Sequence, residues 1–229
     1  MSTRLKKVRR ALAGVNRLAS DAQWFNESHQ VLDIGCGKGE FLKKCPVRCV
    51  GVDGSPQNVA LCNGLGLETY QALLPSRLPF EDEAFDGIYC SHLVEHFLPG
   101  EAREILNEAD RLLMPGGILL VRSPLFRKGF FDDPTHVRPY HLQSVLHMLG
   151  GWEESGTRQS IMGAERRRYD LLSYYEETYP LYVSDVSPTI APRRFPVRLG
   201  LRAMALGMAR MGVGMSGAYG AVLRKRTAA

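Results

Sequence analysis

The chain has 229 residues, of which 45% are hydrophobic and 23% are charged. This length suits one α/β domain with a full core plus a modest appendage, and the composition is ordinary for a soluble globular protein. No stretch reaches the roughly 18 apolar residues of a spanning helix, and no uninterrupted apolar segment follows the basic N-terminus, so we expect neither a transmembrane helix nor a signal peptide.

The net charge of +5 conceals an uneven distribution. Residues 1–20 hold six basic side chains and residues 193–229 hold eight, with no acidic residue in either segment. The stretch between them, 21–192, has 15 basic and 24 acidic residues. An anionic partner should therefore be met at the two ends of the chain.

The cysteines give no sign of a disulfide framework or of a zinc site. Their number is odd and no CxxC pair occurs, so we expect reduced thiols in a cytoplasmic protein. They are Cys36, Cys45, Cys49, Cys62 and Cys90.

The spacing of apolar residues predicts three regions. Residues 1–28 predict a basic amphipathic helix, and residues 29–160 alternate between strand and helix patterns. Residues 161–229 read as a C-terminal extension with a basic helical segment rich in Met and Gly. The alternation in the middle region predicts an α/β fold with a doubly wound, mostly parallel sheet.

Strands and helices of the middle region can be placed individually. Strands are predicted at 31–35, 48–55, 67–72, 85–92 and 118–124, with a weaker one at 152–160. Helices are predicted through Phe41 and Leu42 up to Pro46, from Pro56 to Gly64, from Arg103 to Met114, and over 141–150.

The first strand runs into a glycine-rich turn, Asp33-Ile34-Gly35-Cys36-Gly37-Lys38-Gly39. Glycines let the backbone turn sharply and approach a ligand at the carboxyl end of the strand, where open α/β sheets bind ligands. Asp53 ends the second strand, where a carboxylate can accept both ribose hydroxyls of a nucleoside. The glycines give GxGxG and not the GxGxxG of dinucleotide sites, although both kinds of ligand remain compatible with these features alone.

Four segments together resemble class I S-adenosylmethionine-dependent methyltransferases of the type 11 group, which includes quinone-biosynthesis methyltransferases. They are VLDIGCGKGEF, GVDGSPQNV, LPFEDEAFDGIYCSHLVEH and LLMPGGILLV, and the resemblance covers about residues 29–160. It implies S-adenosylmethionine as the cofactor and the following residues as its contacts: Asp33, Gly35, Cys36, Gly37 and Gly39 at the methionine end, Asp53 and Gly54 at the ribose, Gln71 and Ala72 at the adenine, and Ser91 and His92 near the transferable methyl group. Gln71 stands where the family usually has an aspartate, followed by three extra residues.

The loop after the fifth strand, FFDDPTHVRPYH at 130–141, should overhang the same edge of the sheet. His136 is the candidate general base for an acceptor hydroxyl, since imidazole titrates near neutrality, and Asp133 would orient it. Arg138 and Tyr140 are candidate substrate contacts, with Arg138 suited to an anionic group. The alternative is a structural loop in which Asp and His cap the next helix.

His96 follows Glu95 at a point where some quinone methyltransferases are thought to hold a divalent metal. We expect a structural role for His96 and no metal, because adjacent residues of a helix point in different directions; a metal-binding or base role is the alternative.

The C-terminal segment carries an apolar stripe from Val197 to Met215 in steps of four and three, flanked by arginines. It predicts a helix packed on the domain or on a second subunit, with contact to an anionic membrane surface as the alternative. The chain would then be cytoplasmic, with a possible peripheral place at the inner face of the membrane.

The sequence thus predicts a bacterial enzyme that methylates a hydroxyl of a glycan or lipid-linked small molecule. Two rivals remain. One is an RNA methyltransferase, because basic ends attract phosphate, although no RNA-binding motif is visible and SHLVEH stands where amino-group methyltransferases have an NPPY-type segment. The other is a non-catalytic partner subunit with a methyltransferase fold.

Overall fold

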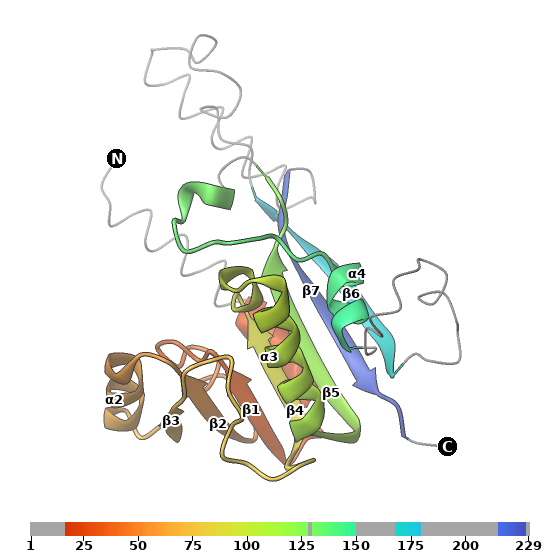
Figure 1. Cartoon of the computed structure of the whole chain (residues 1–229). Helices are drawn as coiled ribbons and strands as arrows, with labels where there is room; N and C mark the ends of the chain where they lie inside the picture. The colour runs from red at the N-terminus through yellow and green to blue at the C-terminus, as the bar shows by residue number, and fades with distance from the viewer. Residues whose placement is uncertain (1–16, 128–129, 150–167, 180–214, 228–229) are drawn as a thin grey trace, which may run out of the picture.

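A seven-stranded sheet forms the centre of the computed structural model, which describes residues 17–127, 130–149, 168–179 and 215–227 (Figure 1). The strand order is β3-β2-β1-β4-β5-β7-β6. Neighbouring strands from β3 to β5 are parallel, whereas β7 runs antiparallel to both β5 and β6. The strands are β1 (Gln30–Ile34), β2 (Arg48–Asp53), β3 (Thr69–Gln71), β4 (Phe85–Ser91), β5 (Leu113–Pro124), β6 (Tyr169–Tyr179) and β7 (Met215–Lys225). The predicted doubly wound, mostly parallel α/β fold is confirmed.

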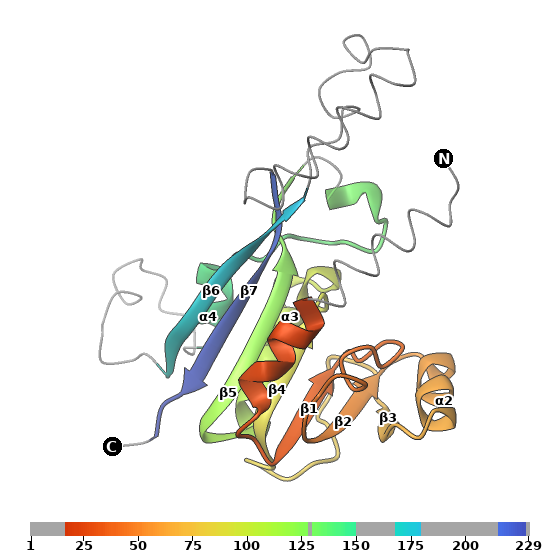
Figure 2. The same ribbon diagram turned by 180° about the vertical axis from the view of Figure 1, so that it is seen from behind.

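Helices cover the two faces of this sheet. The helix α3 and the helix α4 lie over one face, and the helical residues 17–22 lie behind it (Figures 1 and 2). The α-helices whose bounds are described in full are α2 (Pro56–Gly64), α3 (Pro99–Leu112) and α4 (Leu142–Leu149), and three short 3-10 helices are η1 (Gln23–Phe25), η2 (Val94–His96) and η3 (Phe130–Asp132). No helix among the described residues is long and apolar enough to cross a membrane.

Alternation along β4 explains how the chain fills both faces. Ile88 and Cys90 join the core under α3 and α4, while Tyr89 points to the opposite face and stacks on Phe41 at 3.8 Å between ring centroids. Because both faces are covered, the parallel strands are apolar almost throughout. This rigid centre fixes where the strand ends lie.

The helix predicted through Phe41 and Leu42 is wrong. Residues 37–44 form consecutive turns with no regular helix. Gly39 has φ +70°, and Pro46 leaves only six residues between these two breaks. Forming the first helical turn is costly, and so short a segment adds too few hydrogen bonds to offset it.

The last two strands come from the segment that the sequence sets apart as a C-terminal extension. β6 and β7 pair with each other and with β5, so the sheet continues past residue 160. Residues 215–225 are strand, and this strand begins at Met215, where the predicted helical stripe ends. Residues 1–16, the weak strand at 152–160 and the stripe at 197–214 lie outside the described residues.

Candidate active site at the carboxyl edge of the sheet

The glycine turn after β1 is tied to β2 by its own backbone. The N–H groups of Gly35 and Cys36 both donate to the carbonyl oxygen of Val52, at 2.8 and 3.0 Å. Gly35 and Gly37 have φ values of +77° and +53°, in the left-handed region that favours glycine. A Cβ at Gly35 would lie 2.9 Å from a Leu93 methyl carbon, whereas a Cβ at Gly37 would meet nothing within 4 Å. The turn is therefore packed on one side and open above Gly37.

Asp53 holds this turn and the start of α2 together. Its Oδ2 accepts from the N–H of Gly37 at 2.8 Å, and its Oδ1 accepts from the N–H of Ser55 at 2.8 Å and the Asn58 amide at 3.1 Å. A carboxylate offers about four acceptor sites, so these three bonds orient it and leave capacity for a ligand hydroxyl. This arrangement fits the predicted ribose contact.

Asp33 supplies a second carboxyl group at the end of β1. Its side chain is 3% exposed, and burial raises its pKa well above the usual range, with the charge of Asp53 adding to the shift. Burial also raises the pKa of the Cys36 thiol, which therefore stays protonated and is a poor nucleophile. Two carboxyl groups beside an open glycine turn fit the cationic S-adenosylmethionine that the sequence predicts.

The predicted adenine contacts lie beside this group. Gln71 is opposite Asp53 in the pairing of β2 with β3, and its side-chain amide donates to the Gly54 carbonyl at 3.4 Å. The N–H of Ala72 donates to the carbonyl of Asp53 at 3.1 Å. The structure brings these residues together, and their contact with adenine stays a prediction.

A histidine–carboxylate pair follows β4 directly. His92 Nδ1 lies 3.2 Å from Glu95 Oε1, and Glu95 is fully buried. The other carboxylate oxygen, Oε2, accepts from the Ser123 hydroxyl at 3.4 Å. His92 also has φ +53°, an uncommon conformation for a residue other than glycine. The sequence alone marks Glu95 only as the neighbour of His96, and its spacing of three from His92 is the signal that could have indicated this pair.

The loop 130–141 is docked onto η2. The N–H groups of Val137 and Arg138 donate to the Glu95 carbonyl at 2.8 and 3.2 Å. His96 Nδ1 lies 3.1 Å from the carbonyl oxygen of Thr135 and 3.0 Å from its hydroxyl. These contacts fit the structural role predicted for His96, which stays a prediction.

Asp133 is engaged chiefly within the loop. Its Oδ1 accepts from the Thr135 N–H at 2.9 Å and from the Thr135 hydroxyl at 2.6 Å, which holds the pKa of the carboxyl below its usual range. Its Oδ2 is 3.9 Å from His136 Nε2, beyond hydrogen-bond distance. His136 Nδ1 lies 2.7 Å from the Phe130 carbonyl, so it carries the proton and Nε2 keeps its lone pair. The base role of His136 and the orienting role of Asp133 stay predictions.

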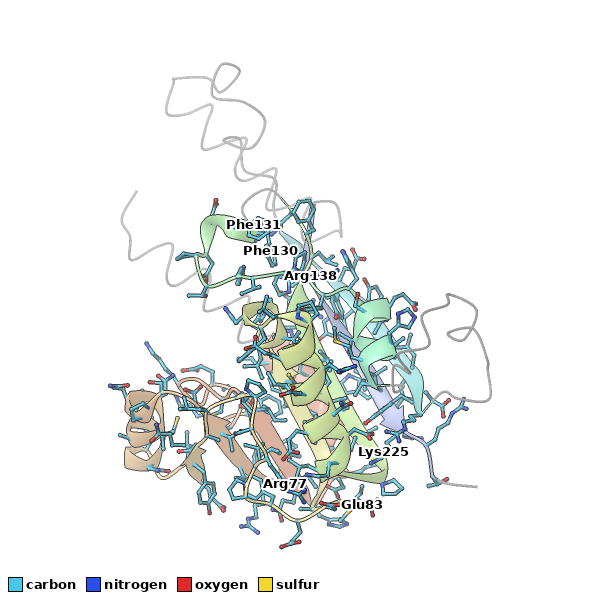
Figure 3. The ribbon with its side chains drawn as sticks, viewed as in Figure 1. Arg77, Glu83, Phe130, Phe131, Arg138 and Lys225 are labelled. Carbon is cyan, nitrogen blue, oxygen red and sulfur yellow. The ribbon has the colours of Figure 1, made fainter. Side chains whose placement is uncertain are left out.

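Tyr140 and Arg138 end the loop in different environments. Tyr140 is buried and donates its hydroxyl to the Phe97 carbonyl at 2.9 Å, which anchors the loop. Arg138 is exposed, with its guanidinium carbon 5.9 Å from the centre of the Tyr140 ring. Figure 3 shows Arg138, Phe130 and Phe131 at the same end of the sheet. Arg138 is therefore accessible to an acceptor, whereas Tyr140 serves the loop.

Three side chains near this point could in principle reach one cation. One ligand atom each from Glu95, His96 and His136 lie within 4.8 Å of one another. Ligands bound to a zinc ion at about 2.1 Å lie closer, about 3.4 Å apart. Both oxygens of Glu95 already have partners, and both imidazoles are tied to the loop backbone. The expectation that the site works without a metal stays a prediction.

The sequence of this chain is similar to sequences of known methyltransferases. Residues 32–121 match the family model Methyltransf_11, described as a methyltransferase domain. The human "Probable tRNA methyltransferase 9B" is 36% identical over 140 residues, which is 59% of this chain and 31% of that protein. The uncharacterized methyltransferase YcgJ of Bacillus subtilis is 32% identical over 141 residues, covering 53% of this chain and 55% of that one. The chain thus spans about half or less of the length of these curated relatives.

Solved structures show the same fold along nearly the whole chain. A SAM-dependent methyltransferase from Archaeoglobus fulgidus has a TM-score of 0.63 at 21% identity and covers 93% of each chain. The crystal structure of YcgJ has a TM-score of 0.59 at 22% identity, covering 92% of this chain and 98% of that one. Residues 32–121 therefore carry a Methyltransf_11 methyltransferase domain, and the fold of the chain, with its sheet order and the glycine turn facing Asp53, is that of the class I S-adenosylmethionine-dependent methyltransferases.

Proposed function

We propose that this protein transfers the methyl group of S-adenosylmethionine to a hydroxyl oxygen of a small acceptor, a glycan or a lipid-linked molecule. The observation that carries the proposal is the group of imidazoles and one buried carboxylate where β4 and β5 end. His92, His96 and His136 all lie there, around Glu95. A hydroxyl must lose its proton to become a good nucleophile, and imidazole is the side chain best suited to accept it near neutral pH.

The cofactor would be held by the residues of the glycine turn and its neighbours. When bound, S-adenosylmethionine supplies a methyl group on a positively charged sulfur. Asp53 would accept from the ribose hydroxyls, Asp33 would face the cationic end, and Ser91 would line the pocket at the end of β4. The chain's own contribution is alignment of the acceptor and exclusion of water from the site.

The acceptor side of the site would be formed by the loop 130–141 and the end of β5. Phe126 and Phe131 are 65% and 60% exposed, with ring centroids 6.4 Å apart. Exposed Phe131 at the same end of the sheet as the accessible Arg138 (Figure 3) suits an acceptor that has both an apolar part and an anionic group. This combination supports a lipid-linked acceptor more than a free sugar.

The test is a panel of acceptors incubated with the full chain and S-adenosylmethionine labelled in its methyl group. Glycosides, lipid-linked glycans and matched amines are compared, and the methylated atom is identified by mass spectrometry. Transfer to hydroxyls supports the proposal, and transfer only to nitrogen would contradict it. A chelator in a parallel reaction should leave the rate unchanged, because the proposed chemistry uses imidazole and not a metal ion.

RNA methylation is the second candidate, favoured by the relative named a probable tRNA methyltransferase and by the basic chain ends. Its test is transfer of the labelled methyl group to total tRNA, together with a salt-dependent mobility shift. A non-catalytic partner subunit would fail to bind labelled cofactor at all. The homodimer or membrane contact predicted for the C-terminal stripe concerns residues 197–214, which lie outside the described part of the chain.

A further inference from the structure

We propose that His92, oriented by the buried Glu95, is the catalytic base that removes the proton from the acceptor hydroxyl. This inference rests on the proposed hydroxyl methylation and names the group that serves it. From the sequence, His92 is predicted as a cofactor contact and His136 as the base. The geometry around the two histidines separates these assignments.

The tautomer of His92 follows from its partner. An ionised carboxylate only accepts hydrogen bonds, so His92 Nδ1 carries the proton in its 3.2 Å contact with Glu95 Oε1. Nε2 then keeps its lone pair, and 42% of the His92 side chain is exposed. A base whose second nitrogen is oriented by a carboxylate is the arrangement that activates hydroxyl groups in many enzymes.

Glu95 is itself fixed from two sides. Ser123 at the end of β5 donates to Oε2, and the N–H groups of Val137 and Arg138 bond the Glu95 carbonyl. The carboxylate is fully buried, so it exchanges little with water and holds one direction. Glu95 is therefore a positioning residue, and the loop 130–141 helps to hold it.

The backbone places His92 beside the glycine turn. Its N–H donates to the Arg122 carbonyl at 3.0 Å, which continues the pairing of β4 with β5. Leu93, the next residue, packs on Gly35. A left-handed φ at a non-glycine residue costs free energy and is found mostly where function requires it. His92 is thus connected to both parts of the site, to the glycine turn through the next residue, Leu93, and to the loop through its partner Glu95.

The reaction balances with this single base. The acceptor O–H proton moves to His92 Nε2, an oxygen lone pair forms the new bond to the methyl carbon, and the carbon–sulfur bonding pair stays on the sulfur of S-adenosylhomocysteine. His136 lacks such support, because Nδ1 donates to a backbone carbonyl and the nearest carboxylate oxygen, on exposed Asp133, is 3.9 Å from Nε2.

The first experiment needs no acceptor. Nitrogen-15 NMR of the full chain with bound S-adenosylhomocysteine reports which ring nitrogen of each of the six histidines carries the proton. We expect His92 to be protonated at Nδ1 in the wild type, and to lose this preference in Glu95→Gln. A proton on Nε2 of His92 in the wild type, or an unchanged spectrum in Glu95→Gln, would overturn the proposal.

The second experiment uses matched variants. Asparagine tolerates the left-handed region and its amide can replace the Nδ1 donor, so His92→Asn and His136→Asn each remove only Nε2. We expect His92→Asn to lower kcat for para-cresol, a hydroxyl that is not ionised at neutral pH, by about a hundredfold or more. Para-nitrophenol, assayed at a pH where it is ionised, should lose less than tenfold, and affinity for S-adenosylhomocysteine should stay within a few-fold.

Each outcome decides between the residues. A large loss in His136→Asn with little change in His92→Asn would restore the base role to His136 and overturn this inference. Hydroxyl methylation that neither variant reduces would also overturn it while leaving the proposed function intact. Transfer to nitrogen alone would contradict the proposed function itself. If the wild type methylates neither phenol, the NMR result alone decides. His29→Ala, an exposed histidine before β1, is the control.

Discussion

The cofactor side and the acceptor side of this site are built differently. On the cofactor side, the bond from Gly37 to Asp53 joins residues 16 apart, and both follow strands that lie next to each other. On the acceptor side, Glu95 is bonded by Ser123, 28 residues away, and His96 meets Thr135, 39 residues away. The cofactor side is a compact sequence motif, whereas the acceptor side forms only when three loops that are distant in the sequence pack together. A change on one side should therefore leave the other side largely intact.

Asp53→Ala should give the largest effect on cofactor binding. The change removes the expected acceptor for the ribose hydroxyls and also releases Gly37, Ser55 and Asn58. We expect the affinity for S-adenosylmethionine, measured by calorimetry, to fall at least tenfold, which is about 1.4 kcal/mol. Glu68→Ala, in an ion pair with Arg48 before β3, is the matched control and should bind normally. Normal binding by Asp53→Ala would remove the ribose assignment.

The sequence was sufficient for the five parallel strands β1 to β5 and for the glycine turn that follows β1. Parallel strands that are covered on both faces appear in the sequence as apolar runs. A turn with positive φ values requires glycine, so it is recognisable from the residue types alone. The prediction of a helix through Phe41 was wrong because it relied on local apolar spacing. Gly39 and Pro46 interrupt the backbone on either side of this short segment and prevent a regular helix. The sequence did not predict β7. Its residues belong to a tail rich in Met and Gly, and they form a strand because they pair with β5.

The acceptor side could not be predicted in the same way. His92 and Glu95 are three residues apart, but η2 is a short 3-10 helix, and no sequence pattern shows that the carboxylate turns inward. The docking of Val137 and Arg138 on the Glu95 carbonyl depends on the path of a loop more than forty residues along the chain. Residue types indicated that chemistry occurs at this edge, and tertiary contacts decided which atoms face each other.

Asp33→Asn should separate stability from binding on the cofactor side. Burial raises the pKa of Asp33 above its unfolded value of 3.8. The contribution of Asp33 to the free energy of unfolding is therefore fully present below pH 3.8, and it is lost as the pH rises through the folded-state pKa. Asparagine does not ionise, so the variant avoids the free-energy cost of burying a carboxylate. We expect a higher Tm in Asp33→Asn, by about 2–4 °C for each kcal/mol relieved, together with several-fold weaker binding of S-adenosylmethionine.

Thermal scans at two pH values check the origin of this gain. The difference in Tm between Asp33→Asn and the wild type should be larger at neutral pH than at mildly acidic pH, because the wild-type cost grows as pH rises. An equal gain at both values would show that ionisation of Asp33 is not its origin, and a loss of stability would show that the carboxyl has a stabilising partner in the folded chain.

Thr135→Val should act on the acceptor side alone. Valine keeps the branched shape but loses the hydroxyl that bonds Asp133 and His96. We expect the free energy of unfolding in urea to fall by about 1 kcal/mol and the backbone amides of Val137 and Arg138, which bond the Glu95 carbonyl, to exchange with deuterium more rapidly, with cofactor affinity unchanged. Thr135→Ser, which keeps the hydroxyl, should behave as the wild type. A change in cofactor affinity would show that the two sides are coupled through η2.

Tyr219→Phe should have the smallest effect, and its sign is informative. Tyr219 is fully buried on β7 opposite Ser123, and its hydroxyl has no hydrogen-bond partner among the described residues. Burial, with the nearby charge of Glu95, raises the pKa of this phenol, so the hydroxyl stays protonated and its donor is unsatisfied. Removing a buried unsatisfied group stabilises a fold, so we expect Tm to rise by about 2–4 °C.

Tyr89→Phe is the matched comparison, because the Tyr89 hydroxyl bonds Asp21 and Arg122, and its loss should lower Tm. A lower Tm in Tyr219→Phe would instead mean that the phenol is bonded through an ordered water to the polar group around Glu95, which would extend the acceptor side of the site to β7.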